Sequence, residues 1–263
     1  MSIQFNQILQ GDCVVTMQQL PAESADLVFA DPPFNIDYPY DEYKDHLAIG
    51  SYLGWTTCWG AAVRRVLKPT GTLWLAIGDE WAAEIKLIFQ NDLGFTCRDW
   101  VVWYYTFGVN CKTKLSRSHT HLLHFVRDPK SFTFNAPAIL VPSARQTLYN
   151  DKRATPGGRI PDNTWILRPE DGTFAAGEDT WHEPRVCGTH AERQGWHPCQ
   201  MPEAILERII RLSSNPGDVV LDPFSGSGTT CAVSKRLGRR WLGIELSADY
   251  AAKSRERIAS VKS

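Results

Sequence analysis

The sequence predicts an α/β protein built on a doubly wound, mainly parallel sheet. Short apolar runs such as residues 26–30 have the length and composition of strands that are buried on both faces, as parallel strands are. Stretches with the helical spacing of apolar residues lie between several of these runs. Residues 218–258 show strand, glycine-rich turn, helix, strand and helix in succession, which is the repeating unit of such a fold.

The first half of the chain alternates between the two kinds of element. The expected strands are residues 8–13, 26–30, 72–77, 100–105 and 121–126, and the expected helices are residues 14–20, 52–67 and 81–89. The helix at 52–67 has its apolar residues on one face and stops at Lys68-Pro69-Thr70-Gly71. Gly94 closes the helix at 81–89.

Regular structure returns near the C-terminus. We expect helices from Pro202 to the Asn215-Pro216-Gly217 turn, from Thr229 to Leu237 and from Ser247 to about Ile258, and strands at residues 218–221 and 241–244. Proline is favourable in the first turn of a helix, and Ser247 is a favourable N-cap. No internal repeat is present.

Length and composition exclude several classes of protein. The 263 residues suit one large α/β domain, or one domain with a sizeable insertion. A net charge of −1 gives no global attraction to nucleic acids or anionic membranes, so such a surface must be local. The N-terminus resembles no signal peptide, and no apolar run is long enough to span a bilayer. Seven scattered cysteines form no disulfide-like framework, so we expect a cytoplasmic protein.

The stretch Ala30-Asp31-Pro32-Pro33-Phe34-Asn35 directly follows the strand expected at residues 26–30. The two prolines donate no backbone hydrogen bond and favour extended geometry before them, so the chain leaves the strand in a stiff loop. The loop presents a carboxylate, free carbonyls and a ring where open α/β sheets bind ligands. These groups suit a nucleobase with an exocyclic amine. Taken alone, a proline-rich turn explains the stretch equally well.

Positive charge is concentrated in the middle of the chain. Between residues 110 and 159 the acids are only Asp128 and Asp151, and the basic residues are Lys112, Lys114, Arg117, Arg127, Lys130, Arg145, Lys152, Arg153 and Arg159. Periodicity fades from Ala136 to about Gly195, and so long an irregular stretch is usually a functional insertion. Its charge makes it a candidate phosphate-contacting surface. A solvated, loop-rich cap accounts for the charge equally well.

The stretch from residue 218 to residue 245 has the features of a nucleoside-binding unit. Gly226 and Gly228 permit a tight turn and close backbone approach to a ligand. Free N–H groups of the next helix begin at Thr229. Glu245 lies 23 residues after Asp222, near the spacing of about 20 for an acid that binds ribose hydroxyls. A structural glycine turn is the alternative.

The dinucleotide fingerprint in this unit is incomplete. Cys231 stands where a third glycine is expected, and no Gly-Lys-Ser/Thr phosphate loop is present. A ligand with a pyrophosphate or triphosphate is therefore disfavoured. A cofactor with a ribose and a carboxylate but no phosphate fits better, and S-adenosylmethionine is such a molecule.

Together, Asp31-Pro-Pro-Phe34 and Asp222-Pro-Phe-x-Gly-x-Gly-Thr-Thr230 resemble the motifs of the exocyclic-amino DNA methyltransferases, which act on adenine N6 or cytosine N4. The catalytic motif comes first, the basic insertion next and the cofactor motif last, an order similar to that of the permuted β group. The resemblance covers residues 9–258 except most of the insertion. It implies a Rossmann-like, circularly permuted S-adenosylmethionine methyltransferase fold with seven strands, one of them antiparallel.

The resemblance divides the chain into a catalytic half at 1–109, a target-recognition insertion at 110–195 that includes the strand at 121–126, and a cofactor-binding half at 196–263. It also implies that the cofactor site is completed across the termini, with Glu245 holding the ribose and Asp12 the adenine amino group. The segment from His197 to Pro202 is similar to a His-Pro-x-Gln-x-Pro stretch beside the cofactor, although family members often have Lys where Met201 stands.

The site residues that follow fall into three groups, and no metal ligand is among them. The catalytic group is Asp31, Pro32, Pro33 and Phe34; the cofactor-binding group is Asp12, Cys13, Asp31, His197, Gln200, Asp222, Pro223, Phe224, Ser225, Gly226, Gly228, Thr229, Thr230, Glu245 and Leu246; and the nucleic-acid-binding group is Lys112, Lys114, Arg117, His119, Lys152 and Arg153.

We interpret the chain as an S-adenosylmethionine-dependent methyltransferase that acts on N6 of a flipped-out adenine in a specific sequence of double-stranded DNA. Phe34 would stack on the base, with Tyr38 or Tyr40 as a second wall. Position 31 is more often Ser in the cytosine branch, so adenine is favoured, and N4-cytosine methylation by the same chemistry is the main alternative. RNA methylation and an inactive DNA-binding relative are less favoured. A second copy of the chain and a cognate restriction endonuclease are further candidate partners.

Two other constellations are set aside. Pro198-Cys199-Gln200 looks like the nucleophile motif of C5-cytosine methyltransferases, but it precedes the cofactor loop and no Glu-Asn-Val partner occurs. A zinc site built from His182, Cys187, His190, His197 and Cys199 would lack any usual ligand spacing.

Overall fold

The structure is a computed structural model that describes residues 4–109, 111–113, 115, 117–163, 185–187 and 190–262. Lys114 and His182, both named above, lie outside these residues. The strands are β1 Gln7–Gln10, β2 Ala25–Ala30, β3 Leu67–Ile77, β4 Thr96–Val109, β5 Arg117–Val126, β6 Val219–Asp222 and β7 Arg240–Glu245. The helices are α1 Cys13–Gln19, α2 Ile49–Val66, α3 Ala82–Leu87, α4 Ala144–Thr147, α5 Glu203–Ser213, α6 Thr229–Arg236 and α7 Ala248–Ser260. A π-helical turn, Ile88–Asp92, follows α3, and a 3₁₀ turn, Ala136–Ile139, precedes α4.

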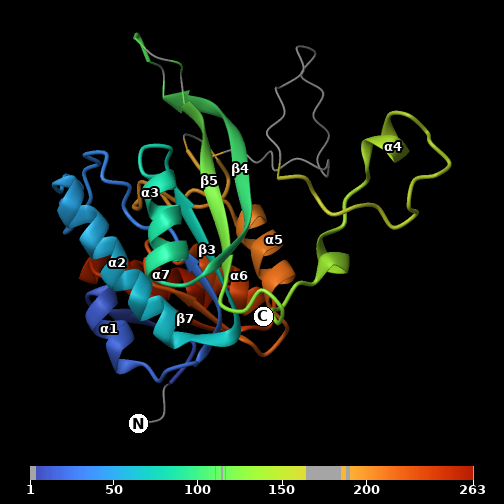
Figure 1. Ribbon diagram of the computed structural model, residues 1–263. Coiled ribbons are helices and arrows are strands. Elements are labelled where there is room, and N and C mark those ends of the chain that lie inside the picture. Colours follow the sequence, from blue (N-terminus) through green and yellow to red (C-terminus); the bar gives the residue numbers. More distant parts are fainter. Residues whose placement is uncertain are drawn as a thin grey trace.

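The strands form one sheet in the order β1-β7-β6-β2-β3-β5-β4 (Figure 1). Only β5 is antiparallel to its neighbours β3 and β4; every other pair in the described sheet is parallel. This arrangement confirms the predicted doubly wound, mainly parallel sheet with seven strands. The strand order reverses between β6 and β2, and ligands bind at the carboxyl ends of strands beside such a switch point.

The two ends of the chain meet in the sheet. β1, from the N-terminus, pairs in parallel with β7, with Gln10 opposite Glu245. The N–H of Gly11 donates to the carbonyl of Glu245 over 2.9 Å. Residues from both ends of the sequence therefore stand together at one edge of the sheet, as the permuted order requires.

Helices cover both faces of the sheet. One apolar cluster packs α1, α2 and α3 against one face, and Trp59 and Phe89 are fully buried within it. A second cluster packs α5 and α6 against the other face, and it is built around residues such as Trp74 and Leu206. The 3₁₀ turn at Ala136–Ile139 packs on the second cluster through Ile139, and residues 140–163 extend from it as an arm that carries α4 (Figure 1). No helix in the described ranges combines the length and apolarity needed to cross a bilayer.

Some strand boundaries differ from the sequence prediction. The helix α2 ends at Val66, close to the predicted end, but β3 begins at Leu67 and not at Thr72 as predicted. The register with β2 shifts between Ala25 and Leu27, so residues 68–71 form a bulge in which Pro69 needs no ladder hydrogen bond. β4 and β5 are also longer than expected, because they continue to pair with each other, as far as Val109 and Arg117, beyond the end of β3.

Candidate active site between two cavities

Two cavities open at the carboxyl ends of β1, β2, β6 and β7. The first, called here the glycine-loop cavity, is lined by Gly11, Asp12, Cys13, Asp31, Pro33, Tyr40, Asp41, Glu42, Tyr43, Trp55, His197, Cys199, Pro223, Phe224, Ile244, Glu245, Leu246, Ser247 and Tyr250. The second, called here the Phe34 cavity, is lined by Asp31, Phe34, Ile36, Tyr38, Tyr40, Gly78, Trp103, Tyr105, Arg117, His119, Thr120, Arg185, Cys199, Gln200 and Met201. Asp31, Tyr40 and Cys199 line both cavities, so a reaction between two ligands would take place beside these residues.

Glu245, at the end of β7, is held by the backbone on both sides. Its Oε2 accepts from the N–H of Gly226 over 2.8 Å, and its Oε1 accepts from the N–H of Ser247 over 2.9 Å. Gly226 has φ +48°, and a Cβ there would lie 2.7 Å from the ring of His197, so only glycine fits this approach. Burial raises the pKa of Glu245. The carboxylate is fixed in direction and keeps free lone pairs for ligand hydroxyls.

Asp31 and Asp222 are neighbours at the switch point. Asp222 is buried, its Oδ1 accepts from the N–H of Phe224 over 2.9 Å, and burial raises its pKa to about 7. Burial and then the charge of Asp222 raise the pKa of Asp31 to about 8. Among the described residues, no group donates a hydrogen bond to the Asp31 carboxylate. Its acceptors are therefore available to a ligand.

Asp12 and Cys13 stand on the opposite wall, where β1 turns into α1. Asp12 caps α1, because its Oδ1 accepts from the N–H of Val15 over 2.9 Å, and its second oxygen remains for a ligand. Burial, and then the charge of Asp12, raises the pKa of Cys13 to about 12, so its thiol stays neutral.

Aromatic residues that the sequence analysis missed complete the glycine-loop cavity. The ring of Trp55 lies 5.6 Å from that of Tyr43 and 5.7 Å from that of Phe224, centroid to centroid. Trp55 belongs to α2, where its spacing is that of an ordinary core position, and Tyr43 lies in the loop after Phe34. Nothing in the sequence distinguishes Trp55 from the buried Trp59 one turn later.

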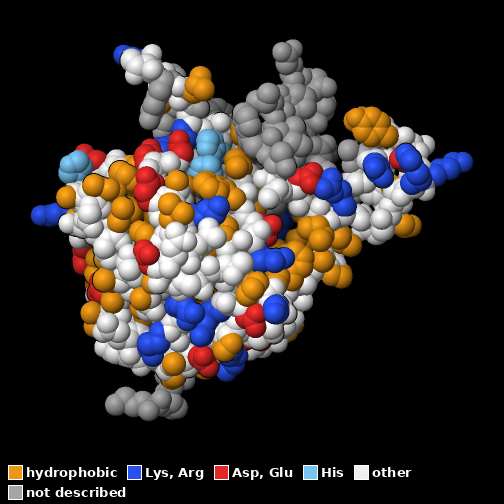
Figure 2. Space-filling view, viewed as in Figure 1, with side chains coloured by type: hydrophobic (Ala, Val, Ile, Leu, Met, Phe, Trp, Pro, Cys, Tyr) orange, Lys and Arg blue, Asp and Glu red, His pale blue; other side chains and the backbone are white. Residues whose placement is uncertain are grey.

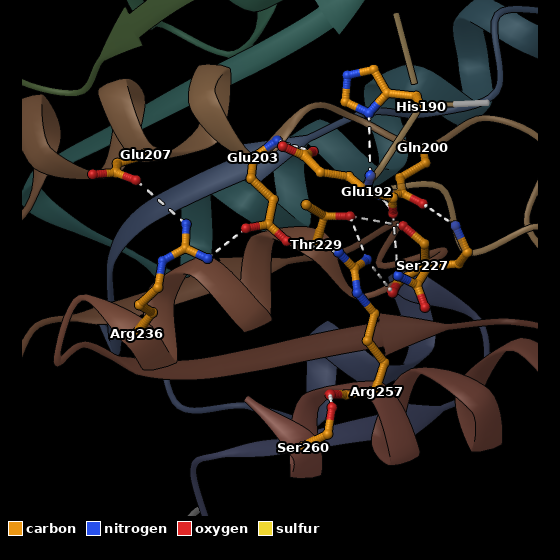
Figure 3. Close-up of polar contacts among 11 residues, drawn as sticks. His190, Glu192, Gln200, Glu203, Glu207, Ser227, Thr229, Arg236, Arg257 and Ser260 are labelled. Atoms are coloured by element: carbon orange, nitrogen blue, oxygen red, sulfur yellow. Dashed lines mark hydrogen bonds and ion pairs between the residues drawn. The ribbon is translucent and has the colours of Figure 1, made fainter. Parts of the chain in front are cut away.

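Several residues predicted to bind the cofactor support the cavity without lining it. Asp222, Ser225, Gly226, Gly228, Thr229 and Thr230 are not among its lining residues. Arg257 of α7 donates to the Ser227 carbonyl over 3.0 Å and to Oγ1 of Thr229 over 2.8 Å, and it also binds Glu203 of α5 over 3.0 Å (Figure 3). Arg257, which the sequence analysis did not identify, thus holds the glycine turn against α5.

Gln200 is predicted to bind the cofactor, but it lies on the side of the site that faces the Phe34 cavity. It lines the Phe34 cavity, and the glycine-loop cavity does not include it. Its side chain donates to the Glu192 carbonyl over 2.8 Å and accepts from the N–H of Gln194 over 3.1 Å (Figure 3). These contacts fold residues 190–200 back on themselves and thereby position His197 and Cys199 at the cavities.

The predicted nucleic-acid contacts fall in three places. Arg117 and His119 line the Phe34 cavity from β5, and Arg117 forms ion pairs with Asp79 and Glu80. Lys112 is exposed at the end of the β4–β5 hairpin. Lys152 and Arg153 are exposed on the arm, where Figure 2 shows Lys and Arg side chains gathered, and Arg153 pairs with Asp151 over 2.9 Å.

The constellations set aside gain no support from the geometry. Burial raises the pKa of Cys199, which makes it a poor nucleophile at neutral pH. Within the described residues, no three His, Cys, Asp or Glu side chains are grouped as they would be to hold a metal ion.

Comparison with known proteins gives consistent matches. Residues 25–256 match the DNA methylase family of N6 and N4 methyltransferases. The chain is 36% identical to the DNA adenine methyltransferase YhdJ of Escherichia coli (strain K12), covering 95% of this chain and 82% of that protein. It is 34% identical to the type II methyltransferase M.HpaI of Haemophilus parainfluenzae, covering 96% and 74%.

Solved structures share the fold. The PvuII DNA methyltransferase (cytosine-N4-specific) superposes with a TM-score of 0.69 at 19% identity, over 99% of this chain and 92% of that one. The M1.HpyAVI–SAM complex gives a TM-score of 0.62 at 21% identity, over 96% and 98%.

Proposed function

Because the chain belongs to the DNA methylase family of N6-adenine and N4-cytosine methyltransferases, we propose that it transfers a methyl group to N6 of an adenine swung out of double-stranded DNA. The family is S-adenosylmethionine-dependent, so the methyl donor is this cofactor. The observation that carries the proposal is the position of Asp31, a carboxylate with unpaired acceptors where the two cavities meet.

The charges around the glycine-loop cavity suit a cationic cofactor. Five acidic side chains line it, and no Lys or Arg is among its described lining residues. The acids are Asp12, Asp41, Glu42 and Glu245, together with Asp31, which holds a proton at pH 7 until a ligand binds. Burial lowers the pKa of His197 to about 4, so this residue adds no positive charge at neutral pH. A sulfonium and an ammonium group would find opposite charge here. The residues present therefore fit S-adenosylmethionine.

Each wall of this cavity has a proposed role. The fixed carboxylate of Glu245 accepts from the ribose hydroxyls, and the free oxygen of Asp12 accepts from the adenine amino group. Phe224 and Trp55 form the apolar sides. Bound there, the cofactor supplies an electrophilic methyl group.

In the Phe34 cavity the target base stacks on Phe34. Asp31 and the Pro32 carbonyl accept hydrogen bonds from its amino protons, which draws the nitrogen toward sp³ geometry and frees its lone pair. The same acceptors stabilise the positive charge that develops on nitrogen in the transition state. No covalent enzyme intermediate is needed, and the proton becomes acidic, and leaves toward Asp31, only after the nitrogen has acquired the methyl group.

Adenine is favoured over cytosine for two reasons. Position 31 is Asp, where the cytosine branch more often has Ser, and YhdJ, at 36% identity, is named an adenine methyltransferase. The resemblance to the cytosine-specific PvuII enzyme is at 19% identity and concerns the fold.

The test is an analysis of the product. Mixed-sequence DNA is incubated with the protein and labelled S-adenosylmethionine, digested to nucleosides and separated. We expect label in N6-methyladenine. Label in N4-methylcytosine alone would overturn the choice of base and leave the roles of Asp31 and Pro32 intact.

We further propose that the arm and the β4–β5 hairpin contact DNA phosphates. Replacing Lys112, Lys152 and Arg153 with Gln should weaken DNA binding and reduce the slope of log affinity against log salt. The reduction should be up to about 0.9 for each phosphate that is no longer neutralised. Cofactor affinity should not change. Fluorescence anisotropy at several salt concentrations measures the slope.

The control for this prediction replaces Arg240 and Lys262, which are also exposed but lie outside residues 110–195. An unaltered slope in the triple variant, or an equal change in the control, would mean that the three residues only solvate the surface.

We also propose two protein partners, a cognate restriction endonuclease and a second copy of this chain. A cognate restriction endonuclease would accompany an enzyme like the type II methyltransferase M.HpaI, and a homodimer is tested by mass measurement in solution. We place the activity in the cytoplasm, where its DNA substrate lies.

A further inference from the structure

The loop directly after Phe34 is organised around Asp45. This residue is 3% exposed, and its carboxylate accepts three backbone hydrogen bonds: Oδ1 from the N–H of Asn35 over 2.7 Å, and Oδ2 from those of Ile36 and Tyr38 over 3.1 and 3.0 Å. The Asp45 carbonyl also accepts from the N–H of Asp37 over 2.7 Å. One buried side chain thus gathers the amides of a whole turn.

Two further contacts hold the flanks of Phe34. The Asn35 side chain donates to the Leu47 carbonyl over 2.9 Å and accepts from the Leu47 N–H over 2.6 Å. The buried hydroxyl of Tyr52, in α2, donates to the Pro33 carbonyl over 2.8 Å. The catalytic stretch is therefore tied to the body of the protein just before and just after its ring.

The turn has a backbone conformation that needs such support. Asn35 has φ +56° and Asp37 has φ +63°, in the left-handed region that side chains disfavour. When the φ angles of successive residues alternate in sign, their N–H groups point to one side of the backbone, where an anion stabilises them. Without the Asp45 carboxylate, the turn would lose its acceptors and relax toward ordinary angles.

This turn carries residues that form part of the wall of the Phe34 cavity. Ile36, Tyr38 and Tyr40 all line the Phe34 cavity, and the rings of Tyr38 and Tyr40 are 5.1 Å apart. Asp45 itself lines neither this cavity nor the glycine-loop cavity. Its influence on a bound base would pass through the backbone that carries the tyrosines.

We propose that Asp45 is a positioning residue for the target base. By binding the amides of Asn35, Ile36 and Tyr38, it fixes the part of the Phe34 cavity wall that Tyr38 and Tyr40 form. The inference rests on the proposed transfer of a methyl group to a flipped base. Asp45 would affect the rate because it determines the position of the base relative to the methyl donor, and a displacement of about 1 Å in a reacting group costs about 10²-fold in rate.

The test compares Asp45→Asn with Asp37→Asn. Both variants remove one negative charge from the same loop, but Asp37 is exposed and lines neither cavity. In Asp45→Asn an amide NH₂ replaces one acceptor and faces backbone N–H groups. The substrate is amplified, unmethylated genomic DNA with tritiated S-adenosylmethionine, and cofactor affinity is measured by calorimetry.

We expect Asp45→Asn to lower kcat by about tenfold or more, with KM for DNA within about threefold because the phosphate contacts are unchanged. Cofactor Kd should change by less than kcat, because Tyr40 also lines the glycine-loop cavity but the Glu245 wall keeps its contacts. Asp37→Asn should stay within about twofold of wild type. A wild-type kcat in Asp45→Asn, or an equal fall in cofactor affinity, would overturn the proposal.

Hydrogen exchange on the wild-type protein tests the same contacts without any activity. The amides of Asn35, Ile36 and Tyr38 should exchange more slowly than that of the exposed Glu42, and they should lose this protection in Asp45→Asn while the amides of β2 keep theirs. Fast exchange of the three amides in wild type would overturn the proposal even if the variant failed to fold. Absence of DNA methylation by wild type, with the amides protected, would instead count against the proposed function.

Discussion

Replacing Asp31 with Ala should abolish methyl transfer to DNA and leave S-adenosylmethionine affinity within a few-fold of wild type. Asp31 lies where the two cavities meet, and its proposed contact is with the amine that becomes positive in the transition state. Removing one electrostatic contact of this kind typically costs about 10²–10³-fold in rate. Tritium transfer measures the rate, and calorimetry measures the affinity.

Asp92→Ala is the matched control, since Asp92 is an exposed acid that lines neither cavity.

The ionisation of Asp31 supplies a second readout. Its pKa of about 8 in the free protein means that it holds a proton at pH 7, and a bound cation would lower that pKa. Binding of the cofactor at pH 7 should therefore release protons. Calorimetric titrations in buffers that differ in ionisation enthalpy measure the number released, and this number should be smaller in Asp31→Asn. Equal losses of cofactor affinity and methyl transfer in Asp31→Ala would remove Asp31 from the proposed role.

Replacing Glu245 with Ala should weaken S-adenosylmethionine binding by about tenfold to a hundredfold. The variant removes the proposed acceptor of the ribose hydroxyls, and a hydrogen bond to a charged group is worth roughly 1.5–3 kcal/mol. It also leaves the N–H groups of Gly226 and Ser247 without their acceptor. Calorimetric titration with the cofactor measures the loss directly.

Methyl transfer should return toward the wild-type rate when the cofactor saturates Glu245→Ala, because the target side of the site is unchanged. Asp12→Ala should weaken binding in the same way from the opposite wall. Glu256→Ala, an exposed position on α7, is the control. If the Glu245 and Asp12 variants both bind the cofactor like wild type, the site is not completed across the termini as we propose.

The sheet and its two motif loops could be predicted from the sequence, because they depend on local properties of the chain. Proline after Asp31 restricts the backbone wherever it occurs. Gly226 and Gly228 have φ +48° and +75°, which follows from a glycine-rich turn before a helix. Short apolar runs form buried strands for the same reason in any α/β protein. The resemblance of the two motifs to a known family then supplied the number of strands, the one antiparallel strand and the meeting of the two ends of the chain.

Which side chains meet around those loops depends on tertiary packing. Trp55 has the spacing of a core residue, and Asp45 is one acid among several in a polar loop, yet one lines the glycine-loop cavity and the other holds the turn beside Phe34. Gln200 faces the Phe34 cavity because its own segment folds back through Glu192 and Gln194. Ser247 binds Asp41 across 206 positions of sequence. Contacts of this kind arise between distant segments, and neither periodicity nor local propensity carries information about them.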